Sequence, residues 1–107
     1  MQTDIIQKLL PSWIVNSSTY SVSVTDLDGK YLFVNQVFYN RFSFISQNFI
    51  GQPFEITMHK DDVDKANQAA IECMNNPGKN VKVYIRKPDI DNATFYWSNG
   101  SFHFFMI

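Results

Sequence analysis

The sequence predicts a small α+β domain, and three observations support this prediction. Two short β-prone runs, at residues 19–25 and 30–34, flank a tight turn. One long helix is expected over residues 61–75. Two further β-prone runs follow this helix, at residues 79–87 and 94–107. This order favours an antiparallel sheet with short helices and one long helix packed on one face, preceded by a short N-terminal helix.

The length and composition of the chain fit one small globular domain. Its 107 residues allow a modest core, and the 16% aromatic content, with ten Phe, favours an aromatic-rich core or interface over a disordered segment. Nine basic and ten acidic residues give a net charge of −1, so no electrostatic case exists for binding nucleic acid or an anionic membrane. Neither a membrane-spanning run nor a signal peptide is visible, and a cytoplasmic location is expected.

The first hairpin is the most informative local feature. Apolar side chains alternate with Ser and Thr in its first strand, the period-two pattern of a half-buried strand. These apolar side chains are Tyr20, Val22 and Val24. Asp28 and Gly29 predict the tight turn, because Gly supplies the positive φ that the turn needs. Asn35 stands at the N-cap position of a short helix expected over residues 36–42.

The long helix is expected to start at Asp61 or Asp62, because either carboxylate can cap its first turn. A stripe of apolar and small side chains predicts its core-facing side. This stripe comprises Val63, Ala66, Ala70, Ile71 and Met74. The Asn-Pro-Gly sequence at 76–78 ends the helix.

The last two β-prone runs differ in character. Residues 79–87 alternate apolar and polar side chains, which predicts a strand with one wet face. Residues 88–92 form a turn region. The final run, residues 94–107, is rich in aromatic side chains, and Gly100 within it suggests a bulge or a void.

An amphipathic helix is expected at residues 3–10, ended by Pro11. Its apolar side chains are Ile5, Ile6, Leu9 and Leu10, which form one face. This face packs either on its own domain or on a partner subunit, and the sequence favours neither alternative.

Several of these segments, in this order and spacing, resemble the PAS family of sensory domains. The segment from Thr25 to Asn35 is similar to the family's opening strand, Asp-x-x-Gly turn, second strand and Asn before an aromatic helix. Residues 44–54 resemble its short-helix segment with an Ile-Gly-x-x-Phe ending. The sequence His-Lys-Asp-Asp at 59–62 resembles its His-Pro-x-Asp entry to the long helix, with Lys60 in place of proline.

The resemblance implies a sensory fold over residues 17–107, with residues 1–16 as a flanking helix. A PAS sheet has five antiparallel strands, and only four are found here. The missing last strand indicates either a fragment of a longer protein or a shortened subfamily. In either case one sheet edge is left unpaired, which invites pairing with another chain.

The acidic residues do not predict a catalytic or metal site. Asp26 and Asp28 lie in a turn, and Asp61, Asp62 and Asp64 lie at a helix start, positions that turn chemistry and N-capping explain. No phosphate-binding loop, catalytic triad order or zinc motif is present. We therefore expect no enzymatic activity from this domain.

No haem or flavin signature is clear, and the cofactor, if any, is unknown. Some PAS domains bind haem through a histidine on the long helix, but here His59 lies before that helix and His103 on the last strand. The Asn-Cys-Arg-Phe-type motif of the flavin-binding members is absent. Cys73, late in the long helix, is either a small filler or a half-exposed thiol.

The remaining candidate site is an apolar pocket between the sheet and the helices, where ligands bind in the family that the chain resembles. The residues expected to line it are Phe42, Phe54, Ile71, Met74, Val83, Ile85 and Phe102. A filled hydrophobic core describes this list equally well.

Two functions follow from the resemblance. The first is a sensory module, most simply the input domain of a bacterial sensor histidine kinase, that senses a small ligand or partner and signals through terminal helices to an output domain of the same chain. The second is a ligand-free domain for dimerisation or protein interaction. A homodimer through the N-terminal helix and a sheet face is expected in both, without nucleic acid or membrane contact.

Overall fold

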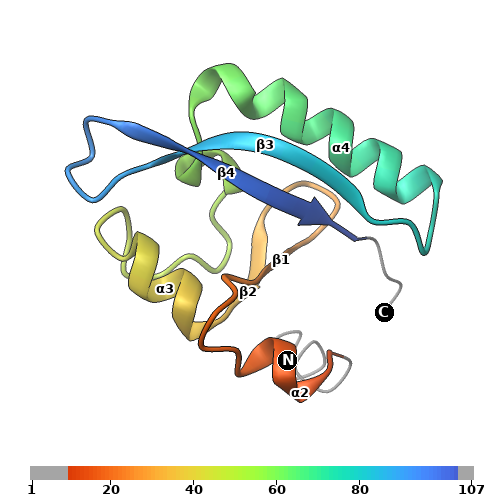
Figure 1. Cartoon of the computed structure of the whole chain (residues 1–107), viewed down its shortest axis with the longest axis horizontal. Helices are drawn as coiled ribbons and strands as arrows, with labels where there is room; N and C mark the ends of the chain where they lie inside the picture. The colour runs from red at the N-terminus through yellow and green to blue at the C-terminus, as the bar shows by residue number, and fades with distance from the viewer. Residues whose placement is uncertain (1–9, 104–107) are drawn as a thin grey trace. The chain divides into compact units, whose positions relative to one another are not determined.

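The computed structural model describes residues 10–103, which belong to two compact units, Met1–Ile56 and Thr57–Ile107. Each unit contains one two-stranded antiparallel sheet, so the described residues hold four strands in two separate sheets (Figure 1). The α+β class predicted from the sequence is confirmed. A single continuous sheet is not seen among these residues.

The first unit begins with a short helix, α2, at Ser12–Val15. The helix predicted at residues 3–10 lies outside the described residues except for its last position. After α2, the hydroxyl of Ser17 accepts hydrogen bonds from the backbone N–H groups of Thr19 and Tyr20. This local turn occupies the start of the strand predicted at residues 19–25, which begins only at Ser23. Tyr20, the first apolar position of the predicted alternation, lies outside the strand and is 65% exposed.

Strand β1, Ser23–Thr25, pairs with β2, Tyr31–Val34. The turn between them is the one that the sequence predicts. Gly29 has a φ of +79°, and the carboxylate of Asp26 accepts hydrogen bonds from the N–H groups of Asp28 and Lys30. The strand pattern confirms the hairpin, although β1 is shorter than the predicted run.

Helix α3, Gln36–Phe42, starts where the sequence predicts, with Asn35 as its N-cap. The Oδ1 atom of Asn35 accepts hydrogen bonds from the N–H groups of Phe38 and Val22, each 3.0 Å long. Its Nδ2 atom donates to the carbonyl of Tyr20. One buried amide side chain therefore caps α3 and holds the chain that leads into β1.

The core of this unit is an aromatic cluster of Tyr31, Phe38, Phe42 and Phe49. Their rings meet edge to face, with centroids 4.9 to 5.9 Å apart. Edge-to-face pairs add about 0.5–1.5 kcal/mol each beyond the burial of apolar area. Strand β2, helix α3 and the loop after it thus share a dense aromatic interior. The 3-10 helix Phe54–Thr57 follows this loop.

The second unit contains the 3-10 helix Lys60–Asp62 and then the long helix α4, Val63–Asn75. Its buried positions are Ala66, Ala69 and Cys73. The predicted core stripe is therefore rotated, and the prediction for Ile71 is wrong, because this side chain is 45% exposed. Small side chains occupy the buried face, which allows a close approach to neighbouring elements.

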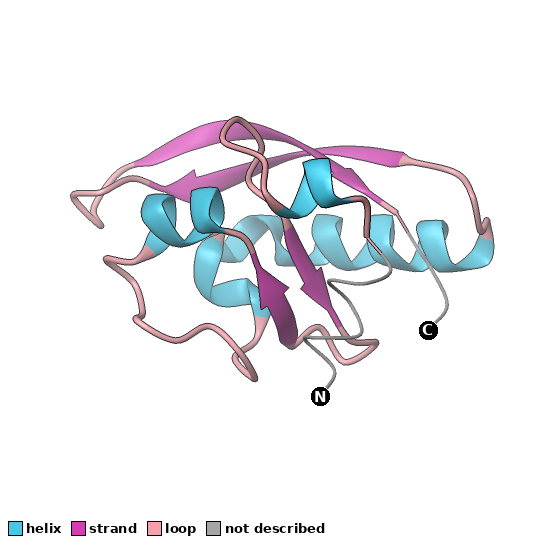
Figure 2. Cartoon of the chain, turned by 90° about the horizontal axis from the view of Figure 1, so that it is seen from below, coloured by secondary structure: helices cyan, strands magenta, loops and turns pink. Residues whose placement is uncertain are grey.

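Strands β3, Val81–Pro88, and β4, Phe95–Phe102, form one long hairpin that runs beside α4 (Figures 1 and 2). All eight residues of β3 pair with β4 in unbroken register, from Val81 with Phe102 to Pro88 with Phe95. The wet face predicted for β3 is confirmed by its burial alternation. The predicted bulge at Gly100 is wrong, since Gly100 pairs directly with Val83 and a methyl group there would meet Val83 at ordinary contact distance.

Candidate functional site

Two of the predicted pocket residues lie in the first unit, where they belong to its core. Phe42 is buried within the aromatic cluster. Phe54 is half-buried and packs against the same cluster, and its ring also lies against the turn at Gly29. In this unit the two side chains are therefore part of a filled hydrophobic core, which was the alternative to a ligand pocket for the predicted residues.

The other five predicted pocket residues lie in the second unit. Val83 and Ile85 are buried on β3, and Phe102 is half-buried on β4. Met74 is half-buried on α4, whereas Ile71 is exposed and does not line an interior. The inner face of β3 is therefore the part of the predicted pocket that the structure brings together, with Val83 and Ile85 side by side on one face of the strand.

Lys87 is a candidate site residue that the sequence analysis missed. It continues the alternation of Val83 and Ile85, so its side chain starts from the inner face of β3. Its Nζ atom lies 3.4 Å from the hydroxyl of Thr57, whose side chain is completely buried. Burial lowers the pKa of Lys87 to about 8, because the charged form is poorly solvated there.

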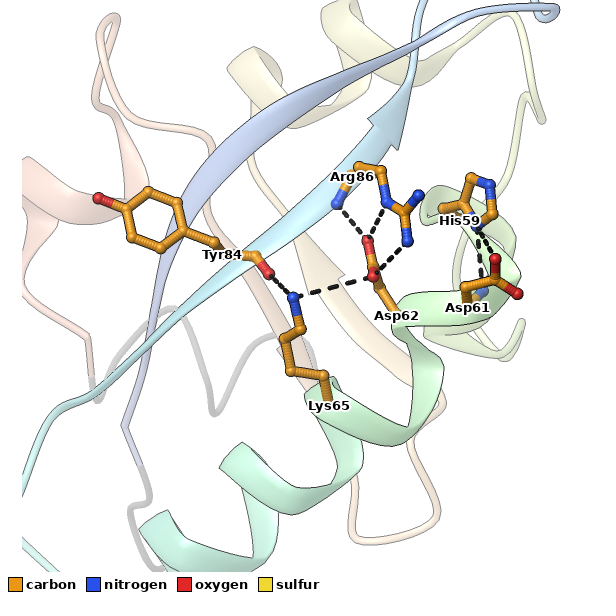
Figure 3. Close-up of polar contacts among 6 residues, drawn as sticks. All are labelled: His59, Asp61, Asp62, Lys65, Tyr84 and Arg86. Atoms are coloured by element: carbon orange, nitrogen blue, oxygen red, sulfur yellow. Dashed lines mark hydrogen bonds and ion pairs between the residues drawn. The ribbon is translucent and has the colours of Figure 1, made fainter.

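A buried ion pair joins the start of α4 to β3 (Figure 3). The carboxylate of Asp62 is only 2% exposed and accepts hydrogen bonds from Nε and Nη2 of Arg86, each 2.9 Å long. It also accepts the backbone N–H of Arg86 at 2.7 Å. These hydrogen bonds hold the pKa of Asp62 far below its usual range and raise that of Arg86.

Lys65 and Trp97 extend this arrangement. The amine of Lys65 donates to the carbonyl of Tyr84 at 2.9 Å and lies 3.9 Å from the Asp62 carboxylate (Figure 3). Two cationic groups lie near the indole ring of Trp97. The amine of Lys65 is 5.2 Å and the guanidinium carbon of Arg86 is 5.1 Å from the ring centroid. The carboxylate is thus saturated with donors, and the cluster stabilises the fold rather than offering a reactive acid.

Each histidine has a structural partner. The Nδ1 atom of His59 accepts the N–H of Asp61 and caps the 3-10 helix that precedes α4, and its ring lies edge-on to Phe95 at 4.6 Å. His103 lies 2.9 Å from the amide oxygen of Asn80. The described residues contain no group of three or more histidine, cysteine or acidic side chains arranged to hold a metal ion.

Cys73 is buried on α4, which supports its interpretation as a small filler. Burial raises the pKa of its thiol, so the thiolate needed for reactivity is disfavoured.

No family model, characterised protein or solved structure matches this chain. Within the described residues, no helix combines the length and the apolar character that crossing a membrane requires.

Proposed function

We propose that this chain is a PAS-like sensory module of a signal-transduction protein, most simply the input domain of a bacterial sensor histidine kinase. It binds a small ligand and passes the resulting change through terminal helices to an output domain of the same chain. The order of elements supports this proposal: two strands, a short aromatic helix, a long helix and two long strands. The proposal includes a PAS-like sheet whose last strand is not among the four that are described.

The observation that carries the proposal is the position of Lys87. Val83 and Ile85 give the inner face of β3 an apolar surface, and Lys87 adds an amine with a lowered pKa to the same face. Thr57 adds a buried hydroxyl within reach of that amine. An apolar surface with a few convergent polar groups is typical of a small-molecule site. The ligand is therefore a small molecule with an anionic or hydrogen-bond-accepting group beside an apolar part.

The ligand proposal is tested with Lys87→Met, which keeps an unbranched side chain of similar length and removes the amine. Lys82→Met is the matched control, because Lys82 is exposed on the opposite face of the same strand. Thermal unfolding would be followed against a set of small carboxylic acids, including succinate, citrate and benzoate. We expect at least one acid to raise the melting temperature of the wild type and of Lys82→Met but not of Lys87→Met.

A second measurement uses Lys87→Met without added ligand. Because a buried lysine destabilises the folded state while it is protonated, wild-type stability should rise as the pH increases from about 8 towards 10, and this rise should vanish in Lys87→Met. If the rise persists in the variant, Lys87 is not the desolvated group. If no acid in the set stabilises the wild type, a carboxylate ligand is excluded.

The alternative function is a ligand-free dimerisation or interaction domain. The exposed aromatic side chains of the β3–β4 hairpin favour it, since Tyr84 is 61% and Trp97 60% exposed. Native mass spectrometry separates the two functions. A small molecule retained on the purified chain supports the sensory module, whereas a dimer without any bound molecule supports the interaction domain.

A further inference from the structure

His59 contacts the elements around it through both its backbone and its ring. Its backbone N–H donates to the carbonyl of Arg86 on β3 at 2.9 Å, and its carbonyl accepts the N–H of Asp62 at 2.9 Å. The Nδ1 atom of the ring accepts the N–H of Asp61 at 3.0 Å, and the ring lies edge-on to Phe95 of β4. The two backbone bonds do not depend on protonation, whereas the ring contacts do.

The cap that this ring forms requires a neutral histidine. Nδ1 accepts the N–H of Asp61 only while this nitrogen carries no hydrogen of its own, which places the ring proton on Nε2. A doubly protonated ring is a donor at both nitrogens and cannot accept that N–H. Histidine is the side chain whose ordinary protonation falls between pH 5 and 8, so mild acidification acts on a cap of this kind.

Asp61 offers a protonated ring a second partner. Its carboxylate oxygen lies 3.8 Å from Nδ1 of His59, and Figure 3 shows both contacts between the two residues. The side chains are 21% and 64% exposed, so water and protons reach them. A small movement of the ring therefore exchanges the backbone N–H of Asp61 for its carboxylate, and water can replace the ring at the released N–H.

The charged groups on the neighbouring elements leave this carboxylate as the acceptor for the ring. On β3, the guanidinium of Arg86 is held by the carboxylate of Asp62, which accepts hydrogen bonds from Nε and Nη2. On β4, the ring faces Phe95, which is uncharged. On the 3-10 helix, Lys60 is an exposed cation and offers no acceptor. The carboxylate of Asp61 is thus the anionic partner that these elements provide.

We propose that His59 is a proton-operated switch at the start of α4. In the neutral state its ring caps the 3-10 helix Lys60–Asp62. In the protonated state the ring leaves the cap and pairs with the carboxylate of Asp61. Acidification is then a signal that this domain registers by itself. The switch does not involve Lys87, so it does not depend on the ligand proposed above.

The exchange acts where the long helix is joined to the hairpin. The cap and the edge-on contact with Phe95, at 4.6 Å between ring centroids, both depend on the orientation of the ring. The bonds from Arg86 to the carboxylate of Asp62 do not involve the ring and hold the start of α4 in either state. Protonation therefore changes the turn before α4 while the fold is kept.

The first experiment follows the backbone amide of Asp61 by two-dimensional NMR of the full chain between about pH 7.5 and 5.5, where aspartate carboxylates are ordinarily charged. His59→Asn is the matched variant, because asparagine is also a good cap but does not gain a proton in this range. With falling pH we expect the amide proton of Asp61 to move upfield in the wild type, as its hydrogen bond is lost, and to stay in place in His59→Asn. Equal movement in both proteins, or a wild-type ring that carries its proton on Nδ1 at about pH 7.5, would overturn the proposal.

The second experiment separates the two partners of the ring. Asp61→Asn keeps the N–H and removes the carboxylate, so the protonated ring gains no ion pair when the cap is lost. Between about pH 7.5 and 5.5, the melting temperature of Asp61→Asn should fall by roughly 4–8 °C more than that of the wild type, the usual effect of losing an N-cap. Adding His59→Asn should abolish this difference. If Asp61→Asn follows the wild type, the carboxylate is not the second partner and the switch is wrong. Lys87→Met should leave both readouts unchanged, so failure of the ligand proposal is distinguishable from failure of this one.

Discussion

The carboxylate of Asp62 accepts three hydrogen bonds from a single residue, Arg86, which lies 24 positions later in the chain. Two of them come from the guanidinium group and one from the backbone. Asp62 stands immediately before α4 and Arg86 lies near the end of β3. This one pair therefore fixes where the long helix starts relative to the strand that follows it.

Asp62→Ala should lower the free energy of unfolding by about 2–3 kcal/mol, because it leaves the guanidinium and the N–H of Arg86 without their acceptor. Urea unfolding followed by circular dichroism measures this loss. Asp64→Ala is the control, since Asp64 is exposed in the first turn of α4 and should change stability little. Similar losses in both variants would show that general helix-start electrostatics, not the ion pair, is responsible.

The same pair predicts the response to acid. The folded-state pKa of Asp62 lies below its unfolded value of about 4, so its contribution is complete above that pH and is lost as the pH falls further. The difference in unfolding free energy between the wild type and Asp62→Asn, which cannot ionise, should therefore shrink below about pH 4. A difference that stays constant down to about pH 2 would contradict the assignment.

Asn35→Ala should destabilise the chain by about 2–3 kcal/mol, more than the loss of an ordinary N-cap. The substitution removes the acceptor of two N–H groups, those of Val22 and Phe38, and the donor to Tyr20. Thermal unfolding compared with Asn40→Ala checks this, because Asn40 is exposed and its side chain bonds only Gln36 among the described contacts. Equal effects would mean that Asn35 acts as a simple cap.

Gly29→Ala and Gly51→Ala form a matched pair at two positive φ angles, +79° and +86°. A methyl group at Gly29 would lie 2.8 Å from ring carbons of Phe54, whereas nothing lies within 4 Å of one at Gly51. Both variants carry the backbone strain of about 1 kcal/mol, and Gly29→Ala adds the collision. We therefore expect a clearly lower melting temperature for Gly29→Ala, and Gly29→Ala with Phe54→Leu should recover part of it.

Local signals in the sequence predicted much of the fold. The Asp28-Gly29 turn, the cap at Asn35 and the helix at residues 36–42 each depend on a few neighbouring residues, and the structure confirms them. The alternation that predicted β3 also held, because one strand face is buried. Such features are decided by backbone geometry within a few positions.

Features that depend on distant contacts were missed. The sequence suggested Asp62 as a helix cap, but its side chain makes no cap bond and binds Arg86 instead. The predicted core stripe of α4 included Ile71, which is exposed, whereas the buried face consists of the smaller side chains Ala66, Ala69 and Cys73. Lys87 could have been found, since extending the alternation of β3 by one step places it on the inner face despite its charge.

The covering of the β3 edge by Asp62, Lys65 and His59 has a further consequence. A hairpin with two free edges could add copies on both sides and grow into a filament. In this hairpin the outer edge of β3 is covered, so no strand can be added on that side. The ion pair at the start of α4 therefore also protects the chain from assembly through the β3 edge, and loosening it would expose that edge to pairing with another chain.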